Sequence, residues 1–224
     1  MFVITADQVA SRRDDDRAGD LIASLERSHG GALLLPADQT AGDEIQLVTA
    51  SARAALSIVL DATRDGRWSV GLGLGDVRTP LPDAARKATG TAFIAAREAV
   101  QAAKRADGRF ALRAASALPT STPIGPDAER ATDTAGTIDA AGVEALVRLL
   151  VLLRERRSEP GWEVVDLART GRLQKDVARE LGISPAAVSA RLKAAMWRAE
   201  SEALAPLERL LAELDAVVGS DITR

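Results

Sequence analysis

The segment from Leu173 to Ala195, LQKDVARELGISPAAVSARLKAA, places two short amphipathic helices on either side of a tight turn. Three apolar residues share one face of the first helix: Val177, Ala178 and Leu181. Gly182 permits the turn, and Ser184 with Pro185 begins the second helix with a capping hydroxyl and a proline in the first position. The spacing therefore predicts a helix-turn-helix, whose second helix has the shape to enter a DNA groove.

The second predicted helix has a small and partly basic outer face. Val188, Leu192 and Ala195 recur at four- and three-residue steps and point toward the first helix. Small outward residues allow close approach to base edges, and basic ones bind phosphates. The candidate DNA-binding residues are Arg172, Gln174, Lys175, Ser184, Ala186, Ala187, Ser189, Arg191 and Lys193. An ordinary helical hairpin with a solvated face is the alternative.

The charge of this segment favours double-stranded DNA as a partner. The whole chain has a formal net charge of −3, which would repel a nucleic acid if it were spread evenly. Between positions 169 and 198, however, seven basic residues stand against the two acids Asp176 and Glu180. The seven are Arg169, Arg172, Lys175, Arg179, Arg191, Lys193 and Arg198.

Composition excludes several other classes of protein. The chain has no cysteine, which excludes disulfides, thiolate metal sites and cysteine nucleophiles. Its single histidine, His29, argues against zinc, and its place at the end of a helical pattern predicts an exposed residue. No stretch approaches the roughly 20 apolar residues of a membrane span, and no signal peptide is recognisable. We therefore expect a cytoplasmic protein with no membrane partner.

The pattern of the chain predicts two domains. Residues 116–140 lose apolar periodicity and collect Pro, Thr, Ser, Gly and Asp, as a linker does. Before them strand and helix patterns alternate, and after them the pattern is helical throughout. We expect an α+β domain over residues 1–115 and an all-α domain over residues 141–224.

The predicted elements of the first domain follow the order βαββαβ with an extra terminal strand. The strands are Phe2 to Thr5, Ala32 to Leu35, Ile45 to Thr49, Trp68 to Leu74 and Phe110 to Leu112, and the helices are Arg17 to Ser28, Ala52 to Thr63 and Gly90 to Arg105. This order is that of a ferredoxin-like or palm-type α+β sandwich. Gly71, Gly73 and Gly75 fall on one face of their strand, where we expect a closely packed helix.

Carboxylates follow one central strand and precede its predicted neighbour. Asp7 comes after the first strand, and Asp43 and Glu44 come before the third. Converging carboxylates suit Mg²⁺, which prefers oxygen ligands and shares them with phosphates. Alternatively, Asp7 begins a loop and Asp43 completes a turn, both common positions for aspartate.

A family resemblance bears on this choice. The order ITADQVASR, AGDEIQLV, SVGLGLGDV and GTAFIAAREAVQAAK resembles the SatD-like family of prokaryotic proteins, over residues 1–106. That family is similar to the palm of class III nucleotidyl cyclases and often carries a C-terminal DNA-binding segment. The resemblance implies a nucleotide site, with Mg²⁺ on two aspartates and a triphosphate against the following loop.

The resemblance assigns roles to individual residues. Asp7 and Asp43 match the metal-binding aspartates, the loop from Gln8 to Ser11 matches the triphosphate cradle, and Arg97 matches the transition-state arginine. Arg12 follows the loop and is a further phosphate contact or a surface residue. Phe93 and Gln39 replace the asparagine and the lysine of active cyclases, so catalysis would lose specific contacts. The ligand-binding candidates are Asp7, Gln8, Ser11, Arg12, Asp43, Glu44 and Arg97.

Two leucine-rich stripes lie in the second domain. One covers Val143 to Arg157 and the other Ala203 to Val218. The last helix either packs on the first or pairs with its twin in a homodimer. We expect a homodimer, which would present two recognition helices to half-sites about one DNA turn apart. The resemblance implies the same, because cyclase-like palms commonly pair head to tail.

Together these patterns predict a transcriptional regulator whose catalytically degenerate palm binds a nucleotide or cyclic nucleotide and changes DNA affinity. Two alternatives remain open. One is a metal-dependent nucleotidyl cyclase with a DNA-binding appendage. The other is a regulator whose palm is only a dimerisation scaffold.

Overall fold

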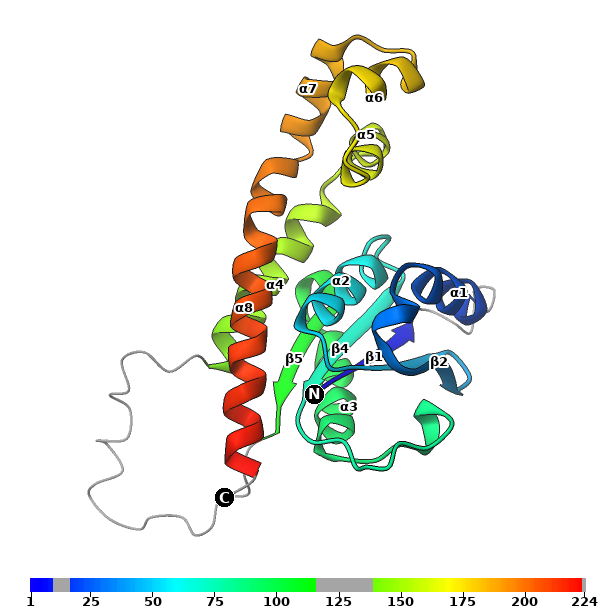
Figure 1. Cartoon of the computed structure of the whole chain (residues 1–224), viewed down its shortest axis with the longest axis vertical. Helices are drawn as coiled ribbons and strands as arrows, with labels where there is room; N and C mark the ends of the chain where they lie inside the picture. The colour runs from blue at the N-terminus through cyan, green and yellow to red at the C-terminus, as the bar shows by residue number, and fades with distance from the viewer. Residues whose placement is uncertain (10–16, 116–138, 223–224) are drawn as a thin grey trace, which may run out of the picture.

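The computed structural model describes residues 1–9, 17–115 and 139–222, in which a mixed five-stranded sheet is joined to eight α-helices (Figure 1). The strands are β1 (Phe2–Gln8), β2 (Leu33–Ala41), β3 (Glu44–Thr49), β4 (Trp68–Leu74) and β5 (Phe110–Ala114). The helices are α1 (Ala18–His29), α2 (Ala52–Ala62), α3 (Thr91–Ala103), α4 (Ala140–Glu155), α5 (Glu159–Arg169), α6 (Gln174–Leu181), α7 (Pro185–Ala194) and α8 (Trp197–Ile222). The predicted order of elements is confirmed up to β5.

The sheet has the strand order β2-β3-β1-β4-β5. β1 is antiparallel to both of its neighbours, β2 is antiparallel to β3, and β5 is parallel to β4. β1 extends three residues beyond its predicted end, because Asp7 is still paired with Glu44 on one side and Ser69 on the other. β2 also runs further than predicted. As an edge strand paired only with β3, it accommodates Pro36 without losing a hydrogen bond on its open side.

The two faces of the sheet are covered by different helices. Phe2, Ile4 and Ala6 alternate along β1 and lie in the core that contains α1 and α2. Val3, on the opposite face of β1, packs with α3. Trp68, at the start of β4, is 3% exposed and belongs to the same core as Phe2 and Ile4.

Glycines let α3 lie almost in contact with the β4 backbone. A Cβ atom on Gly71 would lie 2.2 Å from the backbone nitrogen of Val100, and one on Gly73 would lie 2.3 Å from the carbonyl oxygen of Ala92. Real Cβ contacts of this length do not occur, so any side chain would force helix and strand apart. The predicted close packing of a helix on these glycines is confirmed.

Two C-terminal helices belong to the same core as the sheet. Buried side chains of α4 and α8, among them Val147 and Leu211, cluster with those of the strands and of α2. The leucine-rich helix α8 therefore packs on α4, which is one of the two arrangements predicted for it. Residues 116–138, most of the predicted linker, lie outside the described residues.

The helices α5, α6 and α7, here called the tip, lie at the end of the molecule away from the sheet (Figure 1). They share a small core of their own, made of Val164, Val177, Ala178 and Val188. Partly buried leucines complete this core, including Leu181 and Leu192. In the part of the chain that the structure describes, no helix is long and apolar enough to cross a membrane.

Candidate functional site

The turn between α6 and α7 has the geometry that its residues predict. Gly182 ends α6 with a φ of 64°, a left-handed conformation that glycine adopts at little cost. Ser184 caps α7, since its hydroxyl oxygen accepts a hydrogen bond from the Ala187 backbone at 3.1 Å. Pro185 occupies the first turn of α7. The predicted turn and cap are confirmed.

The outer face of α7 is exposed and carries small side chains. Val188 is buried toward α5 and α6, as its spacing predicts. Ala186, Ser189, Ala190 and Lys193 are exposed, and Ala187 is half-buried. A flat, accessible helix surface of this kind is what close approach to a groove requires.

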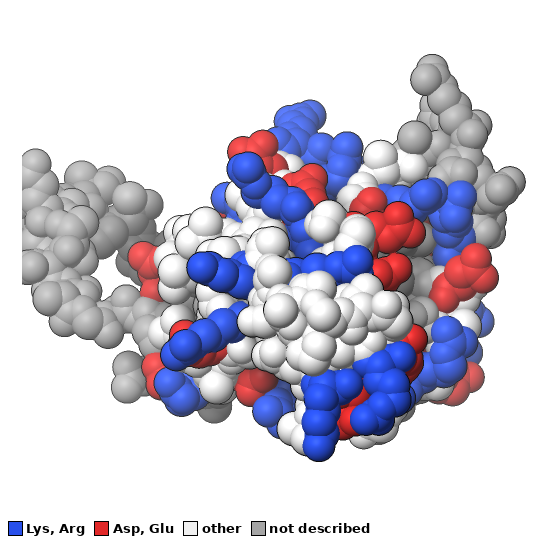
Figure 2. Space-filling model, turned by 90° about the horizontal axis from the view of Figure 1, so that it is seen from above, with Lys and Arg blue, Asp and Glu red and all other residues white. Residues whose placement is uncertain are grey.

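Acidic neighbours neutralise part of the predicted basic surface. Three arginines of the tip form ion pairs there, namely Arg172 with Glu180, Arg179 with Asp176, and Arg191 with Glu163. Lys175 and Lys193 are exposed and have no ion pair with any described residue. Viewed from the tip end, Lys and Arg lie around uncharged atoms, with acids beside several of them (Figure 2). Gln174 is also exposed.

The strand-end carboxylates are neighbours, as predicted from the order of strands. Asp7 lies opposite Glu44 in the sheet, and the Gln8 backbone donates a hydrogen bond to the carbonyl of Asp43 at 3.2 Å. The Asp7 carboxylate already has a cationic partner, the ammonium of Lys104 at 2.7 Å. Glu44 accepts a hydrogen bond from the Thr40 hydroxyl. Among the described residues, no group of three or more His, Asp and Glu side chains is placed to hold a metal ion.

Other predicted ligand-binding residues lie apart from this edge. Arg97 is exposed on α3 and lines a separate pocket of about 600 Å³ together with Arg78. Lys104, which contacts Asp7, lies seven residues further along the chain, or about 10 Å along the helix axis. Within one chain, the structure therefore does not bring Arg97 together with the acids. Ser11 and Arg12 lie outside the described residues.

The remaining positions named by the resemblance have structural roles. The Gln8 side chain is buried, and its oxygen accepts a hydrogen bond from the Arg17 backbone at 3.1 Å. Phe93 is 7% exposed and packs with Val3 on the sheet. The Gln39 side chain donates to the carbonyl of Gly42 in the hairpin between β2 and β3.

A buried group of charges, here called the junction cluster, lies where the tip meets the sheet half, the name used here for the sheet with α1 to α4. It consists of Asp61, Arg154, Arg157, Arg169 and Glu200, which come from helices α2, α4, α5 and α8 and from the residues just after α4. Glu200 is fully buried and accepts hydrogen bonds from Arg154 at 2.6 Å, from Arg169 at 2.7 Å and from Arg157. Arg154 also donates to the carbonyl of Leu60 in α2.

An aromatic ring lies against the same arginines. The guanidinium carbons of Arg64, Arg157 and Arg154 lie 4.1, 4.3 and 5.0 Å from the centroid of the Trp162 ring. Arg64 also donates two hydrogen bonds to Asp166 in α5. Cations over an aromatic face are attracted to it, so Trp162 adds to the attachment of α5.

The charges determine the protonation of the cluster. Burial by itself raises the pKa of Glu200, but the charge of Arg154 and the hydrogen bonds from Arg157 and Arg169 bring it below its usual value. Burial lowers the pKa of Arg154 to about 10, although Glu200 opposes this shift. At neutral pH the cluster therefore contains ionised groups with three arginines around one glutamate, and Asp61 supplies a second negative charge at its edge.

His29 differs from its predicted exposed position. Its side chain is 13% exposed, and its Nε2 lies 2.9 Å from the carboxylate of Asp61. Burial raises the pKa of Asp61, but the His29 hydrogen bond and the charges of Arg169 and Arg154 lower it overall. The prediction was wrong because periodicity in α1 does not reveal the approach of α2.

The sequence of α8 contains one indication of the junction cluster, although a search for apolar periodicity does not detect it. Glu200 precedes Leu204 and Leu207 by four and seven residues, which places an acid in line with the inward stripe of α8. A charged residue on an inward face requires a buried partner. Arg169, counted from the sequence with the basic surface of the tip, turns toward this glutamate instead.

The geometry distinguishes two candidate sites, an exposed helix face on the tip and a strand edge whose acids have partners. Both candidate sites are inferred from the residues of this chain alone. Comparisons with protein-family models, with curated proteins and with solved structures found no match.

Proposed function

We propose that this protein is a prokaryotic transcriptional regulator that binds double-stranded DNA through its tip. The observation that carries the proposal is the exposed face of α7, which begins at a capped turn at the far end of the molecule. In this interpretation α6 and α7 form a helix-turn-helix, and α7 is the recognition helix. Small residues such as Ala186 and Ser189 allow the helix to approach base edges closely.

Lys175 and Lys193 are proposed as the main phosphate contacts. Both are exposed without an acidic partner among the described residues, whereas Arg172, Arg179 and Arg191 would first have to leave an ion pair. Removing either lysine side chain should weaken DNA binding. It should also reduce the slope of the logarithm of the affinity against the logarithm of the salt concentration by about one.

The proposal is tested by fluorescence anisotropy with genomic DNA fragments at several salt concentrations. The double variant Lys175→Ala/Lys193→Ala should bind more weakly and reduce the salt slope by about two. Lys87→Ala is the matched control, because this lysine lies on the sheet half in an ion pair with Asp83. If the wild-type chain binds no duplex even at low salt, the proposal is wrong.

The sheet half is proposed as a ligand-sensing domain that resembles a ferredoxin-like, cyclase-type palm. The order of the four antiparallel strands supports this resemblance. A nucleotide with Mg²⁺ would bind near Asp7 and Asp43, and a metal ion there would have to displace Lys104 from Asp7. Phe93 and Gln39 support binding without cyclisation, since Phe93 has no hydrogen-bonding group and Gln39 carries no charge.

Calorimetry with ATP or GTP and Mg²⁺ tests this half of the proposal. Asp43→Asn should weaken binding, and Asp83→Asn, on the same half of the molecule, should not. Turnover that vanishes in Asp43→Asn would instead establish a cyclase. If Asp7→Asn and Asp43→Asn leave both ligand response and DNA affinity unchanged, the sheet half is only a scaffold.

A homodimer is part of the same proposal. The leucines of α8 are already packed on α4, so the contact between copies would use other surfaces, such as exposed Ile94 on α3 or Leu146 on α4. Sedimentation of the full chain across a range of concentrations tests the assembly. A mass that stays at one chain would contradict it.

A further inference from the structure

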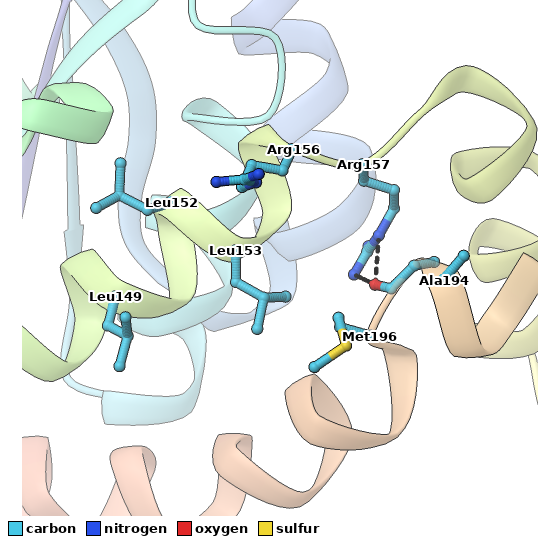
Figure 3. Close-up of a pocket in the computed structure, with 8 residues that line it drawn as sticks. Leu149, Leu152, Leu153, Arg156, Arg157, Ala194 and Met196 are labelled. Atoms are coloured by element: carbon cyan, nitrogen blue, oxygen red, sulfur yellow. Dashed lines mark hydrogen bonds between the residues drawn. The ribbon is translucent and has the colours of Figure 1, made fainter.

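A pocket of about 450 Å³ lies between the end of α4 and the joint between α7 and α8. Figure 3 shows Leu149 and Leu153 of α4 on one side and Met196, at the joint, on the other. The volume is within the usual range for small-molecule sites. A molecule in this pocket would touch the sheet half through α4 and the DNA-binding tip through the joint.

The pocket has apolar walls that are open to solvent. Leu149 is 63% exposed and Met196 is 50% exposed, and Leu152 and Leu153 line the same space. Apolar side chains gathered at one exposed place commonly mark a binding surface. The walls therefore favour a ligand with a hydrocarbon or aromatic body.

The charged residues of the pocket are both arginines. Arg156 is exposed and has no ion pair with a described residue. The Arg157 side chain is fully buried in the wall, and its Nη1 has no hydrogen-bond acceptor in the described part of the chain. Arg157 is already paired with Glu200, so exposed Arg156 is the cation that an anionic group in the pocket would meet.

The joint beside the pocket is strained and held by Arg157. Met196 has a φ of 53°, in the left-handed region that side chains other than glycine rarely adopt. The carbonyl of Ala195 accepts two hydrogen bonds from Arg157, at 3.1 and 2.8 Å (Figure 3). A ligand that contacts Met196 would thus act on the joint that sets the direction of α7 relative to α8.

We infer that this pocket is an effector site for a small apolar molecule that carries a carboxylate. The leucines and Met196 bind its apolar body, and exposed Arg156 binds its anionic group. Its regulatory consequence rests on the proposed DNA-binding function, because the ligand would shift the population of tip orientations and hence DNA affinity. Binding itself requires no DNA.

The experiment uses decanoate as the probe and the two methionines of the chain, Met1 and Met196, as reporters. In protein labelled at the methionine methyl carbons, the NMR signal of Met196 should move saturably with decanoate while that of Met1 stays in place. Calorimetry should show that Arg156→Ala binds about tenfold more weakly, the loss expected for one charged contact. Arg209→Ala is the control, since Arg209 is an exposed arginine of α8 outside the pocket.

Three results would contradict the inference or a part of it. Decanol in place of decanoate should bind more weakly, and equal binding of both would overturn the role of Arg156. If the Met196 signal does not respond to decanoate, the pocket is not the site. If Leu149→Ser instead lowers the sedimenting mass, a second copy of the chain covers the face and the inference is wrong.

DNA affinity is measured separately. A change with decanoate that Arg156→Ala abolishes supports regulation through the pocket. If decanoate binds at Met196 and DNA affinity stays constant, the regulatory part is wrong. If the protein binds no DNA at all, the proposed function fails while the NMR and calorimetry still decide whether the pocket binds the probe.

Discussion

Different interactions stabilise the sheet half and the junction cluster. Between β4 and α3, glycines bring backbone against backbone, and α3 packs on the sheet through Ala92, Phe93 and Ala96. At the junction, one buried glutamate faces three arginines, and all three lie over the ring of Trp162. The first contact depends on shape, whereas the second depends on every charge keeping its partner.

This difference determines which part of the molecule is sensitive to a small change. Apolar burial responds little to pH or salt, but a buried ion group becomes unfavourable as soon as one partner is removed. The junction cluster ties α5 and α8 to α2 through Arg154 and Asp61. We therefore expect the position of the tip to be the more easily altered property and the sheet to be the more robust.

Removal of Glu200 should have the largest effect. Glu200→Ala leaves three buried or half-buried arginines without their shared carboxylate, and we expect a loss of about 3 to 5 kcal/mol in the free energy of unfolding. Urea unfolding measures it, with amide hydrogen exchange in α5 reporting on the junction and exchange in β4 on the sheet.

The two reporters also test the comparison itself. In Glu200→Ala, amide exchange in α5 should accelerate more than exchange in β4. Glu200→Gln, which keeps the shape and part of the hydrogen bonding, should lose less. A loss below about 1 kcal/mol in Glu200→Ala would mean that the cluster contributes no more than a surface ion pair.

Gly71→Ala tests the contact that depends on shape. Its Cβ would overlap the backbone of α3, so we expect a loss of about 1 to 3 kcal/mol in unfolding free energy, measured by urea denaturation. Gly19→Ala is the matched control. Gly19 lies in α1 with open space around it, so alanine there should stabilise the protein by up to about 1 kcal/mol. Equal effects at the two positions would contradict the proposed close fit.

Acid should weaken the junction before it weakens the apolar contact. The pKa values of Glu200 and Asp61 are lowered in the folded protein, so their contribution is present above the unfolded values of 4.5 and 3.8 and is lost as pH falls through the folded values. Between about pH 6 and about pH 3, unfolding free energy should therefore fall less steeply in Glu200→Gln than in the wild type. Equal slopes would mean that other carboxylates dominate.

Sequence patterns predicted most of the strands and helices, because strand alternation and helix caps depend on residues close together in the chain. Alternation along Trp68–Leu74 and the glycines within it indicated both the strand and its closely packed helix, and the cap at Ser184 placed the start of α7. The end of β2 was missed, because Pro36 interrupts the strand pattern and only pairing to β3 shows that the strand continues.

Contacts between distant residues could not be predicted in the same way. The order of strands placed Asp7 beside Glu44, but nothing near Asp7 in the sequence indicates that Lys104 is its partner. The junction cluster joins residues 61, 154, 157, 169 and 200. Glu200 lies in line with the inward stripe of α8, but nothing in the sequence indicates which distant charges meet it there. Periodicity reports which face of a helix is buried, but not which charges will meet there.

The smallest expected effect concerns the tip alone. Ser184→Ala removes the cap of α7 and should cost about 1 kcal/mol, seen as faster amide hydrogen exchange in α7. Ser189→Ala, an exposed serine within the same helix, is the control and should leave exchange unchanged or slower. Because the core of the tip is small, the cost should be confined to α6 and α7 while exchange in β1 and β4 stays the same. If exchange in the strands accelerates equally, the tip and the sheet unfold as one unit, and the junction cluster is as firm a connection as the apolar core.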